Sequence, residues 1–112
     1  YGLVGSEMCI RDRCYVIYEG KKDKVRLLDL DTPEISNPKC EKEYILGIEA
    51  REYINQLISE GKRIEFETEY NRDFFGRILS YIIVDGENVS KLMVSHSLGV
   101  LYDKNNKKDW CE

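Results

Sequence analysis

The sequence has no apolar run that approaches the roughly 20 residues of a transmembrane helix. Its start lacks a basic stretch followed by a long apolar one, so no segment predicts a secretory signal peptide. An excess of basic residues is also missing, because 17 lysines and arginines face 21 acidic residues for a net charge of −4. This balance argues against a protein that holds nucleic acid by a broad basic surface. It does not exclude an enzyme with a small, locally positive site.

Closely spaced cysteine pairs are lacking as well. No two of the four cysteines have the C-x-x-C spacing typical of a zinc or redox site: they are Cys9, Cys14, Cys40 and Cys111. We therefore expect four separate, reduced thiols. The alternative is a bridge between Cys40 and Cys111, or one that involves Cys14, because spacing does not reveal the geometry that a disulfide needs.

What is present is the composition of one ordinary globular domain. The 112 residues are 42% hydrophobic and 34% charged, and a chain of this length can bury a single core without staples. The string SEMCIRD at residues 6–12 resembles the translation of a transposon-end adapter used in sequencing libraries. We therefore expect residues 1–13 to be a leader foreign to the natural protein and residues 14–112 to form an N-terminally truncated domain.

Hydrophobic periodicity predicts four strands and two helices. Alternating or β-branched segments indicate strands at residues 14–18, 25–30, 63–68 and 78–84. Apolar residues at three- and four-residue spacing indicate a helix at 41–60, with one stripe made by Leu46, Ala50, Ile54, Leu57 and Ile58. A shorter helix is expected at 89–97. The order strand, strand, helix, strand, strand, helix predicts an α+β fold, a small barrel with a helix inserted midway.

The densest group of chemically versatile residues lies at the end of the second predicted strand. Arg26 enters on the strand, and Asp31 and Glu34 flank a Thr-Pro pair. Proline fixes its own φ and restricts the residue before it, so this turn can hold two carboxylates at a set separation. One carboxylate could bind a hard cation while the other orients a water. The alternative interpretation is a surface cluster of salt bridges.

The spacing of Arg26 and Asp31 sets a condition on that interpretation. The two residues are five apart, so on a regular strand their side chains point to opposite faces. They converge only where Asp31 lies beyond the ladder or where a bulge intervenes.

A second group is the string DFFGR at residues 73–77. A glycine before the arginine lets the backbone turn tightly and aim the guanidinium of Arg77. Taken alone, this string is equally typical of an ordinary surface arginine.

Together these strings resemble the staphylococcal-nuclease-like (thermonuclease) family. VRLLDLDTPE at residues 25–34 is similar to the family's V-R-L-x-x-I/V-D-T-P-E, and DFFGR is similar to its D-x-Y-G-R. Between them, Gly47, Glu49 and Ala50 match the G-x-E-A of the family's first helix. VDGENV at 84–89 and SHSLGVLY at 95–102 resemble later segments in the same order. The resemblance covers residues 14–110 with nearly the family's spacings.

The resemblance implies a five-stranded OB-type β-barrel with packed helices, and it implies roles for single residues. Arg26 and Arg77 would bind and neutralise the scissile phosphate, and Glu34 would orient or deprotonate the attacking water. Asp31 would ligate calcium by its carboxylate and Thr32 by its backbone carbonyl. Two further residues would line the substrate site: Phe75 and Tyr102.

Two departures from the family pattern accompany the match. The family's first strand begins with D-G-D-T, and the register places Asp12 in the slot of its second aspartate, another calcium ligand. Asp12 falls in the expected leader, and Arg13 replaces the threonine. Phe75 stands where many relatives have tyrosine, so a hydroxyl contact to substrate would be lost.

The function that the resemblance implies is a calcium-dependent endonuclease that hydrolyses phosphodiester bonds and leaves 3′-phosphate ends. The expected cofactor is Ca²⁺. The expected partners are DNA and RNA, preferably single-stranded. We expect no membrane association, and we expect a monomer. The alternative is a catalytically impaired OB-type module that binds nucleic acid or a protein partner.

Overall fold

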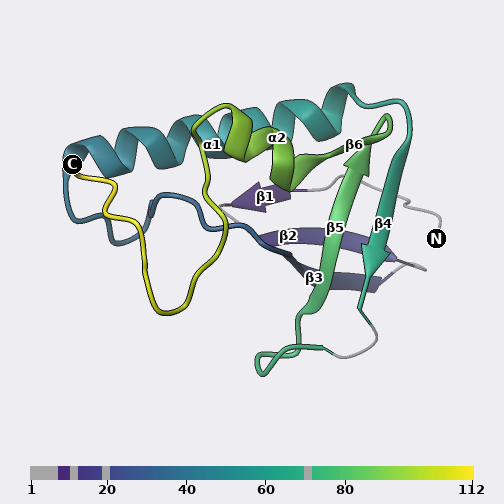
Figure 1. Ribbon diagram of the computed structural model, residues 1–112. Helices are drawn as coiled ribbons and strands as arrows, with labels where there is room; N and C mark the ends of the chain where they lie inside the picture. Colours follow the sequence, from purple (N-terminus) through teal and green to yellow (C-terminus); the bar gives the residue numbers. More distant parts are fainter. Residues whose placement is uncertain (1–7, 11–12, 19–20, 70–71) are drawn as a thin grey trace.

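The computed structural model of the protein describes residues 8–10, 13–18, 21–69 and 72–112. These residues form one mixed sheet with two helices beside it (Figure 1). The elements in chain order are β1 (Met8–Ile10), β2 (Arg13–Tyr18), β3 (Lys21–Leu27), α1 (Glu41–Glu60), β4 (Ile64–Thr68), β5 (Ile78–Val84), β6 (Glu87–Asn88) and α2 (Val89–Ser95). In this part of the chain neither helix combines the length and hydropathy needed to cross a bilayer.

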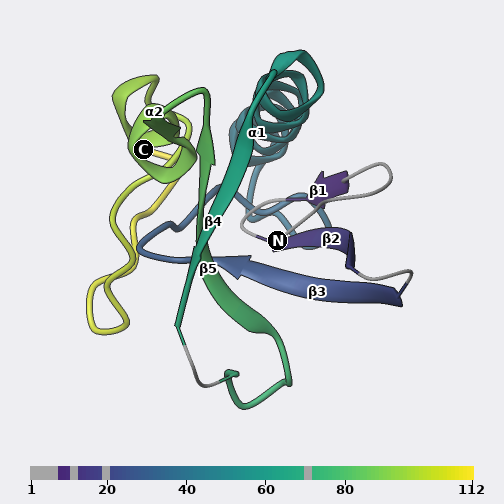
Figure 2. The ribbon, with the colours of Figure 1, turned by 90° about the vertical axis from the view of Figure 1, so that its right-hand side faces the viewer.

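The sheet follows the order β1-β2-β3-β5-β4, and β6 adds two residues beside β5. All pairings are antiparallel except that of β3 with β5, which is parallel and joins the first meander to the second. The sheet twists strongly, so β4 and β5 cross β3 at a steep angle in Figure 2. A five-strand path of this kind, with both helices packed beside it, confirms the expected α+β fold of the OB type.

Alternation along the strands separates a buried face from a polar one. Val25 and Leu27 of β3 are buried, and Arg26 between them points to the opposite face because successive strand side chains alternate. The same alternation in β5 buries three side chains: Ser80, Ile82 and Val84. The arginine-bearing face of β3 and β5 is therefore the one that faces away from the core.

Helix α1 has the bounds that the periodicity predicts. Its buried positions follow three- and four-residue spacing: Glu43, Gly47, Ala50, Ile54 and Ile58. The stripe thus continues toward the N-terminus through a glutamate and a glycine rather than through Leu46, which is half-buried. Two positions of the buried stripe are thus occupied by Glu43 and Gly47 instead of apolar side chains, and both residues contact the loop of the candidate site described below.

Helix α2 follows a tight turn whose residues match its backbone demands. Asp85 and Gly86 have φ values of 51° and 85°, the left-handed pair that a two-residue hairpin turn requires. Asn88 then caps the helix, since its side chain accepts hydrogen bonds from the backbone N–H of Ser90 and Lys91. The chain leaves α2 at Ser95, two residues earlier than predicted.

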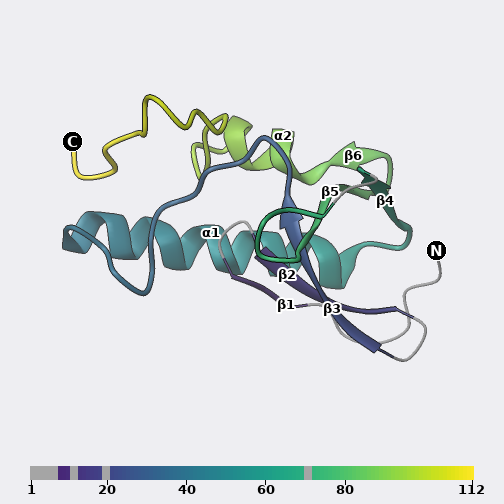
Figure 3. The same ribbon diagram turned by 90° about the horizontal axis from the view of Figure 1, so that it is seen from below.

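The hydrophobic core lies between the sheet and the helices. It is formed by side chains that are at most 6% exposed: Cys9, Cys14, Val16, Val25, Leu27, Leu30, Ala50, Ile54, Ile58, Ile82, Val84, Val89 and Met93. Beyond this core the C-terminal tail runs back along the molecule, and the C-terminus lies near the start of α1 (Figures 1 and 3).

Two strands were not anticipated from the pattern. β1 lies within the segment expected to be a foreign leader, whose origin stays a prediction, and it pairs with β2 through Cys9 opposite Cys14. β6 is too short to show a period. β3 spans Lys21–Leu27 instead of 25–30. It starts earlier because residues 21–23 pair with β2, and it ends earlier because Asp29 takes a φ of 57° and turns the chain out of the ladder.

Candidate active site

Two arginines belong to the same face of the sheet, Arg26 on β3 and Arg77 directly before β5. Parallel pairing sets Arg26 of β3 beside Leu79 of β5, and Arg77 precedes Leu79 by two residues, so its side chain returns to the same face. With about 3.3 Å per residue along a strand and about 4.8 Å between strands, the two arginine Cα atoms lie roughly 8 Å apart. Two side chains of this length can converge on one phosphoryl group.

Asp73 fixes the direction of Arg77. Its Oδ2 accepts a hydrogen bond from Arg77 Nε at 2.7 Å, and its Oδ1 accepts one from the Arg77 backbone N–H at 2.9 Å. Burial raises the pKa of Asp73, but the hydrogen bonds from Arg77 and its charge together outweigh burial and hold that pKa below the ordinary 3.8. A charged carboxylate therefore orients the guanidinium at neutral pH.

Arg26 lies against the C-terminal tail. Its guanidinium carbon is 4.9 Å from the centre of the Tyr102 ring, a distance at which a cation and an aromatic face attract each other. The tail is anchored two residues earlier by an antiparallel bridge between Asp31 and Val100, whose two N–H···O bonds both measure 2.9 Å. The bridge to the loop of Asp31 therefore positions the tail so that Tyr102 contacts Arg26.

Asp31 itself lies beyond the end of the β3 ladder. The turn at Asp29 takes the chain away from the sheet, and Ser90 Oγ of α2 donates a hydrogen bond to the Leu28 carbonyl at 2.9 Å, which holds the turn in place. Asp31 is therefore released from the strict alternation that would set it opposite Arg26. This is the first of the two conditions that the sequence left open.

Glu34 is held against α1 by residues that the sequence analysis did not single out. The Glu43 carboxylate, 5% exposed, accepts hydrogen bonds from the backbone N–H of Lys39 at 2.7 Å and of Glu34 at 3.4 Å. Gly47 lets the same loop approach the helix, since a Cβ there would lie 3.0 Å from the Glu34 carbonyl oxygen and 3.1 Å from that of Pro33. The half-buried Glu34 thus stands on a supported loop.

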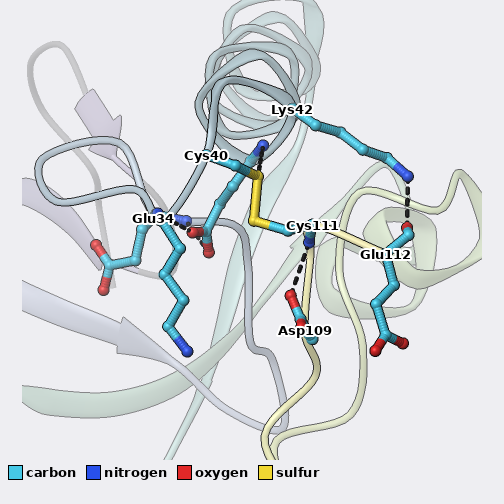
Figure 4. Close-up of a disulfide and its surroundings, with 8 residues drawn as sticks. Glu34, Cys40, Lys42, Asp109, Cys111 and Glu112 are labelled. Carbon is cyan, nitrogen blue, oxygen red and sulfur yellow. Dashed lines mark hydrogen bonds between the residues drawn. A yellow bond between two sulfur atoms is a disulfide. The ribbon is translucent and has the colours of Figure 1, made fainter.

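A disulfide between Cys40 and Cys111 joins this loop to the C-terminal tail (Figure 4). Cys40 caps α1, and its sulfur accepts a hydrogen bond from the Glu43 N–H at 3.4 Å. On the other side Trp110, only 6% exposed, fixes the tail. Figure 4 shows the Glu34 carboxylate directed away from the disulfide. The tail that carries Tyr102 and the loop that carries Glu34 are therefore tied together covalently.

The expectation of four reduced thiols is wrong. Besides the bridge between Cys40 and Cys111, Cys9 and Cys14 form a second disulfide between β1 and β2. The alternative that the sequence leaves open, a bridge between Cys40 and Cys111 or one that involves Cys14, therefore holds for both. The absence of C-x-x-C spacing excludes only a metal or redox site formed by cysteines close together in the sequence. It carries no information on two cysteines 71 positions apart whose Cα atoms folding brings to 6.1 Å.

A basic cleft of about 380 Å³ opens beside Arg77. Most of the residues that line the cleft are cationic or aromatic: Arg13, Tyr15, Lys24, Phe75 and Arg77. The guanidinium carbon of Arg77 lies 5.2 Å from the centre of the Phe75 ring. The predicted substrate-site residues thus meet the predicted arginines in two separate contacts, Phe75 with Arg77 and Tyr102 with Arg26.

The loop at residues 31–34 contains oxygen donors of the kind that a hard cation such as Ca²⁺ prefers over zinc: carboxylates at Asp31 and Glu34 and backbone carbonyls such as that of Thr32. Among residues 8–10, 13–18, 21–69 and 72–112, no three histidine, cysteine, aspartate or glutamate side chains form a metal cluster by themselves. Asp12, the remaining expected ligand, lies outside the described residues.

An OB-type sheet with one arginine on β3 and another directly before the adjacent β5 defines the class of protein, and sequence comparison gives its family. Residues 24–111 match the family described as staphylococcal nuclease homologue. The chain belongs to this family.

Two curated relatives come from Bacillus subtilis (strain 168). The chain is 39% identical over 101 residues to endonuclease YncB, a match that covers 86% of this chain and 47% of the relative. It is 36% identical over 101 residues to the SPbeta prophage-derived endonuclease YokF, covering 86% of this chain and 33% of that relative. The chain therefore spans less than half the length of these relatives.

Proposed function

We propose that this domain is a calcium-dependent endonuclease that hydrolyses the phosphodiester bonds of DNA and RNA. The observation that supports the proposal is the parallel pairing of β3 with β5, which sets Arg26 beside Leu79, two residues after Arg77. The loop that contains Asp31 and Glu34 follows β3 in the chain. The relatives' names support the same reaction class, since both are called endonucleases.

In this proposal the two arginines hold the scissile phosphate. A guanidinium stays charged at any working pH and donates two parallel hydrogen bonds to phosphate oxygens. Negative charge grows on those oxygens in the transition state, so each fixed donor contributes about 10²–10³ in rate. Asp73 keeps Arg77 oriented, and the Tyr102 ring flanks Arg26. The donors are thus set before substrate arrives, which is the condition for this kind of stabilisation.

Glu34 is assigned the role of orienting a water molecule and accepting its proton. The water oxygen forms a bond to phosphorus while the bond to the 5′ oxygen breaks. The leaving oxygen takes a proton from solvent, so the products are a 3′-phosphate and a 5′-hydroxyl. Glu34 serves as the base only where its carboxylate reaches the water at about 3 Å, and its loop is supported by Glu43 and Gly47.

The residues assigned to the cation are Asp31, through its carboxylate, and Thr32, through its carbonyl, with Asp12 as a further carboxylate. When bound there, Ca²⁺ neutralises phosphate charge and keeps exchangeable water close to phosphorus. The donors are all oxygens, which is the chemistry that calcium requires.

The proposed substrates are DNA and RNA, preferably single-stranded, bound by a monomer. Phosphate grip and aromatic contacts carry no direct information on base identity. The net charge of −4 limits long-range attraction, so binding depends on the few cations of the cleft.

Digestion of a labelled single-stranded oligonucleotide tests the proposal. We expect cleavage with Ca²⁺, none with excess chelator, and a rate about 10²–10⁴-fold lower for Glu34→Gln. The matched control is Glu49→Gln, which removes an exposed carboxylate from α1 and should leave the rate unchanged. Equal cleavage by the parent with and without Ca²⁺ and by Glu34→Gln would overturn the mechanism. Calcium-independent binding without any product would instead identify the alternative, a nucleic-acid-binding module.

A further inference from the structure

Three cationic side chains follow one another along β3 on a single face: Lys22, Lys24 and Arg26, here called the cationic row. Successive strand side chains point to alternate faces, and Val25 and Leu27 between and beyond them are buried. The cationic row therefore lies on the face turned away from the core. Side chains on one face recur about every 6.6 Å along a strand. This spacing is of the same order as that of successive phosphates in a nucleic-acid strand.

Lys24 connects the cationic row to the basic cleft. Parallel pairing sets Val25 beside Ile78. The residues that precede these two, Lys24 and Arg77, therefore come next to each other, and both line the cleft. A lysine ammonium binds phosphate as a compact point charge with three N–H donors. When Arg77 holds one phosphate, the next phosphate along the strand is thus within reach of Lys24.

Tyr15 of β2 supports the far end of the cationic row. It lies opposite Lys24 in the antiparallel register, so its ring belongs to the same face of the sheet. The centre of this ring is 4.6 Å from the Nζ atom of Lys22, a distance at which an ammonium and an aromatic face attract each other. The contact favours positions of the Lys22 ammonium over that face before any ligand binds.

The acidic residue within this stretch of β3 does not cancel the charge of the cationic row. Alternation directs Asp23 to the opposite face, and its carboxylate accepts two hydrogen bonds from the Arg72 guanidinium, both at 2.9 Å. The hydrogen bond from Arg72 lowers the pKa of Asp23, so the two opposite charges persist as a pair. Within the part of the chain that the structure describes, neither Lys22 nor Lys24 forms an ion pair with a carboxylate. Both lysines are exposed to solvent.

We propose that Lys24 and Lys22 hold, in this order, the first and second backbone phosphates on one side of the scissile bond. The inference rests on the proposed function and adds a direction to it: the substrate backbone follows β3 from Arg26 toward the start of that strand. Arg13 pairs with Arg26 across the sheet, but it falls in the expected leader and is not part of the proposal. Contacts to phosphates that do not react strengthen substrate and transition state equally, so they lower KM rather than raise kcat.

Salt-dependent binding tests the cationic row. The Kd of a fluorescent hexathymidylate is measured with Ca²⁺ at several NaCl concentrations, in the Glu34→Gln background so that the ligand survives. Each lost phosphate contact lowers the slope of log affinity against log salt by about 0.7 for a single strand, which weakens the Kd about 5-fold at 0.1 M salt relative to 1 M. We expect this change in Lys24→Ala and again in Lys22→Ala. Lys24→Arg keeps the charge and should stay close to the Glu34→Gln protein.

A matched variant controls for net charge. Lys62→Ala removes an exposed lysine just before β4, whose first residue pairs with the last residue of β5. Lys62 thus lies at the end of β5 opposite to Arg77, and its replacement should keep the slope of the Glu34→Gln protein. An equal loss of slope in Lys62→Ala and Lys24→Ala would show a response to net charge alone and overturn the cationic row.

Ligand length gives a second readout. A dinucleotide has a single phosphodiester and no neighbouring phosphates. Lys24→Ala should therefore weaken the binding of hexathymidylate several-fold more than it weakens the binding of a thymidine dinucleotide. An equal loss on both ligands would place Lys24 on the scissile phosphate and contradict the proposed assignment.

The remaining outcomes separate this inference from the proposed function. Unchanged slopes in Lys22→Ala and Lys24→Ala, with binding lost in Arg77→Ala, would overturn the cationic row and leave the nuclease proposal standing. Absence of Ca²⁺-dependent cleavage by the parent protein would overturn the proposed function. Slopes that still fall in the two lysine variants would then support the cationic row as the phosphate-binding surface of a nucleic-acid-binding module.

Discussion

The buried carboxylate of Glu43 accepts a hydrogen bond from the backbone N–H of Glu34 at 3.4 Å. One glutamate on the core-facing stripe of α1 therefore supports the loop on which the other stands. The same carboxylate accepts a bond from Lys39 at 2.7 Å, so both ends of the loop depend on it. An apolar side chain at this position would extend the core stripe but leave two N–H groups without their acceptor.

Replacing Glu43 should therefore lower catalysis through Glu34. Glu43→Gln keeps one oxygen acceptor but turns an NH₂ group toward one of the two N–H donors, so we expect a loss of unfolding free energy of about 1–3 kcal/mol. Because small displacements of a positioned group reduce rate steeply, kcat should fall about 10- to 100-fold while KM changes little. Urea unfolding and steady-state kinetics measure the two effects.

Glu43→Ala extends this comparison. It removes both acceptors and should lower kcat and stability further than Glu43→Gln, whereas Glu49→Gln on the exposed side of α1 should match the parent. A parent-like kcat in Glu43→Gln, together with reduced stability, would show that Glu43 serves the fold and not the position of Glu34.

Gly47→Ala should destabilise the protein although alanine is the better helix former. Elsewhere in a helix this change gains about 1 kcal/mol. Here the new Cβ would lie 2.8 Å from Ile35 Cγ1 and 3.0 Å from the Glu34 carbonyl oxygen, and backbone oxygens do not yield easily. We expect a net loss of about 1–3 kcal/mol in urea unfolding and a lower kcat. Stabilisation of Gly47→Ala, as for an ordinary helix glycine, would contradict the close approach of the loop.

The sequence predicts those parts of the fold that depend on local signals. The bounds of α1 and β5 match their periodicity to the residue, and Asp85 and Gly86 identify the turn between β5 and β6 because the turn demands their backbone conformations. The family resemblance then predicts the OB-type fold. The element bounds and the turn share one cause, which is that each signal lies within a few residues of the feature it specifies, whereas the resemblance draws on motifs spread over residues 14–110.

The remaining features depend on contacts between distant segments. The local sequence predicts Glu43 as an exposed residue at the start of a helix. It is buried only because the loop packs over it, and that loop supplies the N–H groups that its carboxylate binds. The pairing of Cys40 with Cys111 requires the tail to return to α1, and the contact of Tyr102 with Arg26 requires the bridge between Asp31 and Val100. No local pattern encodes these three relationships, because each arises when the chain closes on itself.

Removal of the disulfide between Cys40 and Cys111 should lower stability more than removal of the one between Cys9 and Cys14. A crosslink restricts the unfolded chain more when it closes a longer loop. Sequence separations of 71 and 5 correspond to about 4 and about 2 kcal/mol by the chain-entropy relation. Double alanine variants compared by urea unfolding give the two values. Four reactive thiols in the native parent protein would contradict both bridges.

Catalysis provides a second measure of the longer bridge. The double variant at Cys40 and Cys111 frees the tail from the loop of Glu34, so kcat should fall even at temperatures where the protein stays folded. The double variant at Cys9 and Cys14 serves as the comparison, since that bridge joins β1 to β2 and ties neither the tail nor the loop of Glu34. An equal effect of both variants on kcat would show that the longer bridge has no specific link to Glu34.

The stabilising effect of Asp73 should disappear in acid. The bonds and charge of Arg77 hold the pKa of Asp73 below its ordinary 3.8 in spite of burial, so the folded state favours the charged carboxylate. A carboxyl group with a lowered folded pKa contributes stability that is fully present above the unfolded value and is lost as the pH falls through the folded value. The difference in unfolding free energy between the parent and Asp73→Asn should therefore be constant from pH 8 to about 5 and shrink below about pH 4. Urea unfolding across this range measures it, with Asp103→Asn in the exposed tail as the control. A difference of the same size at pH 3 and pH 7 would mean that the asparagine disturbs packing and that the charge of Asp73 contributes little.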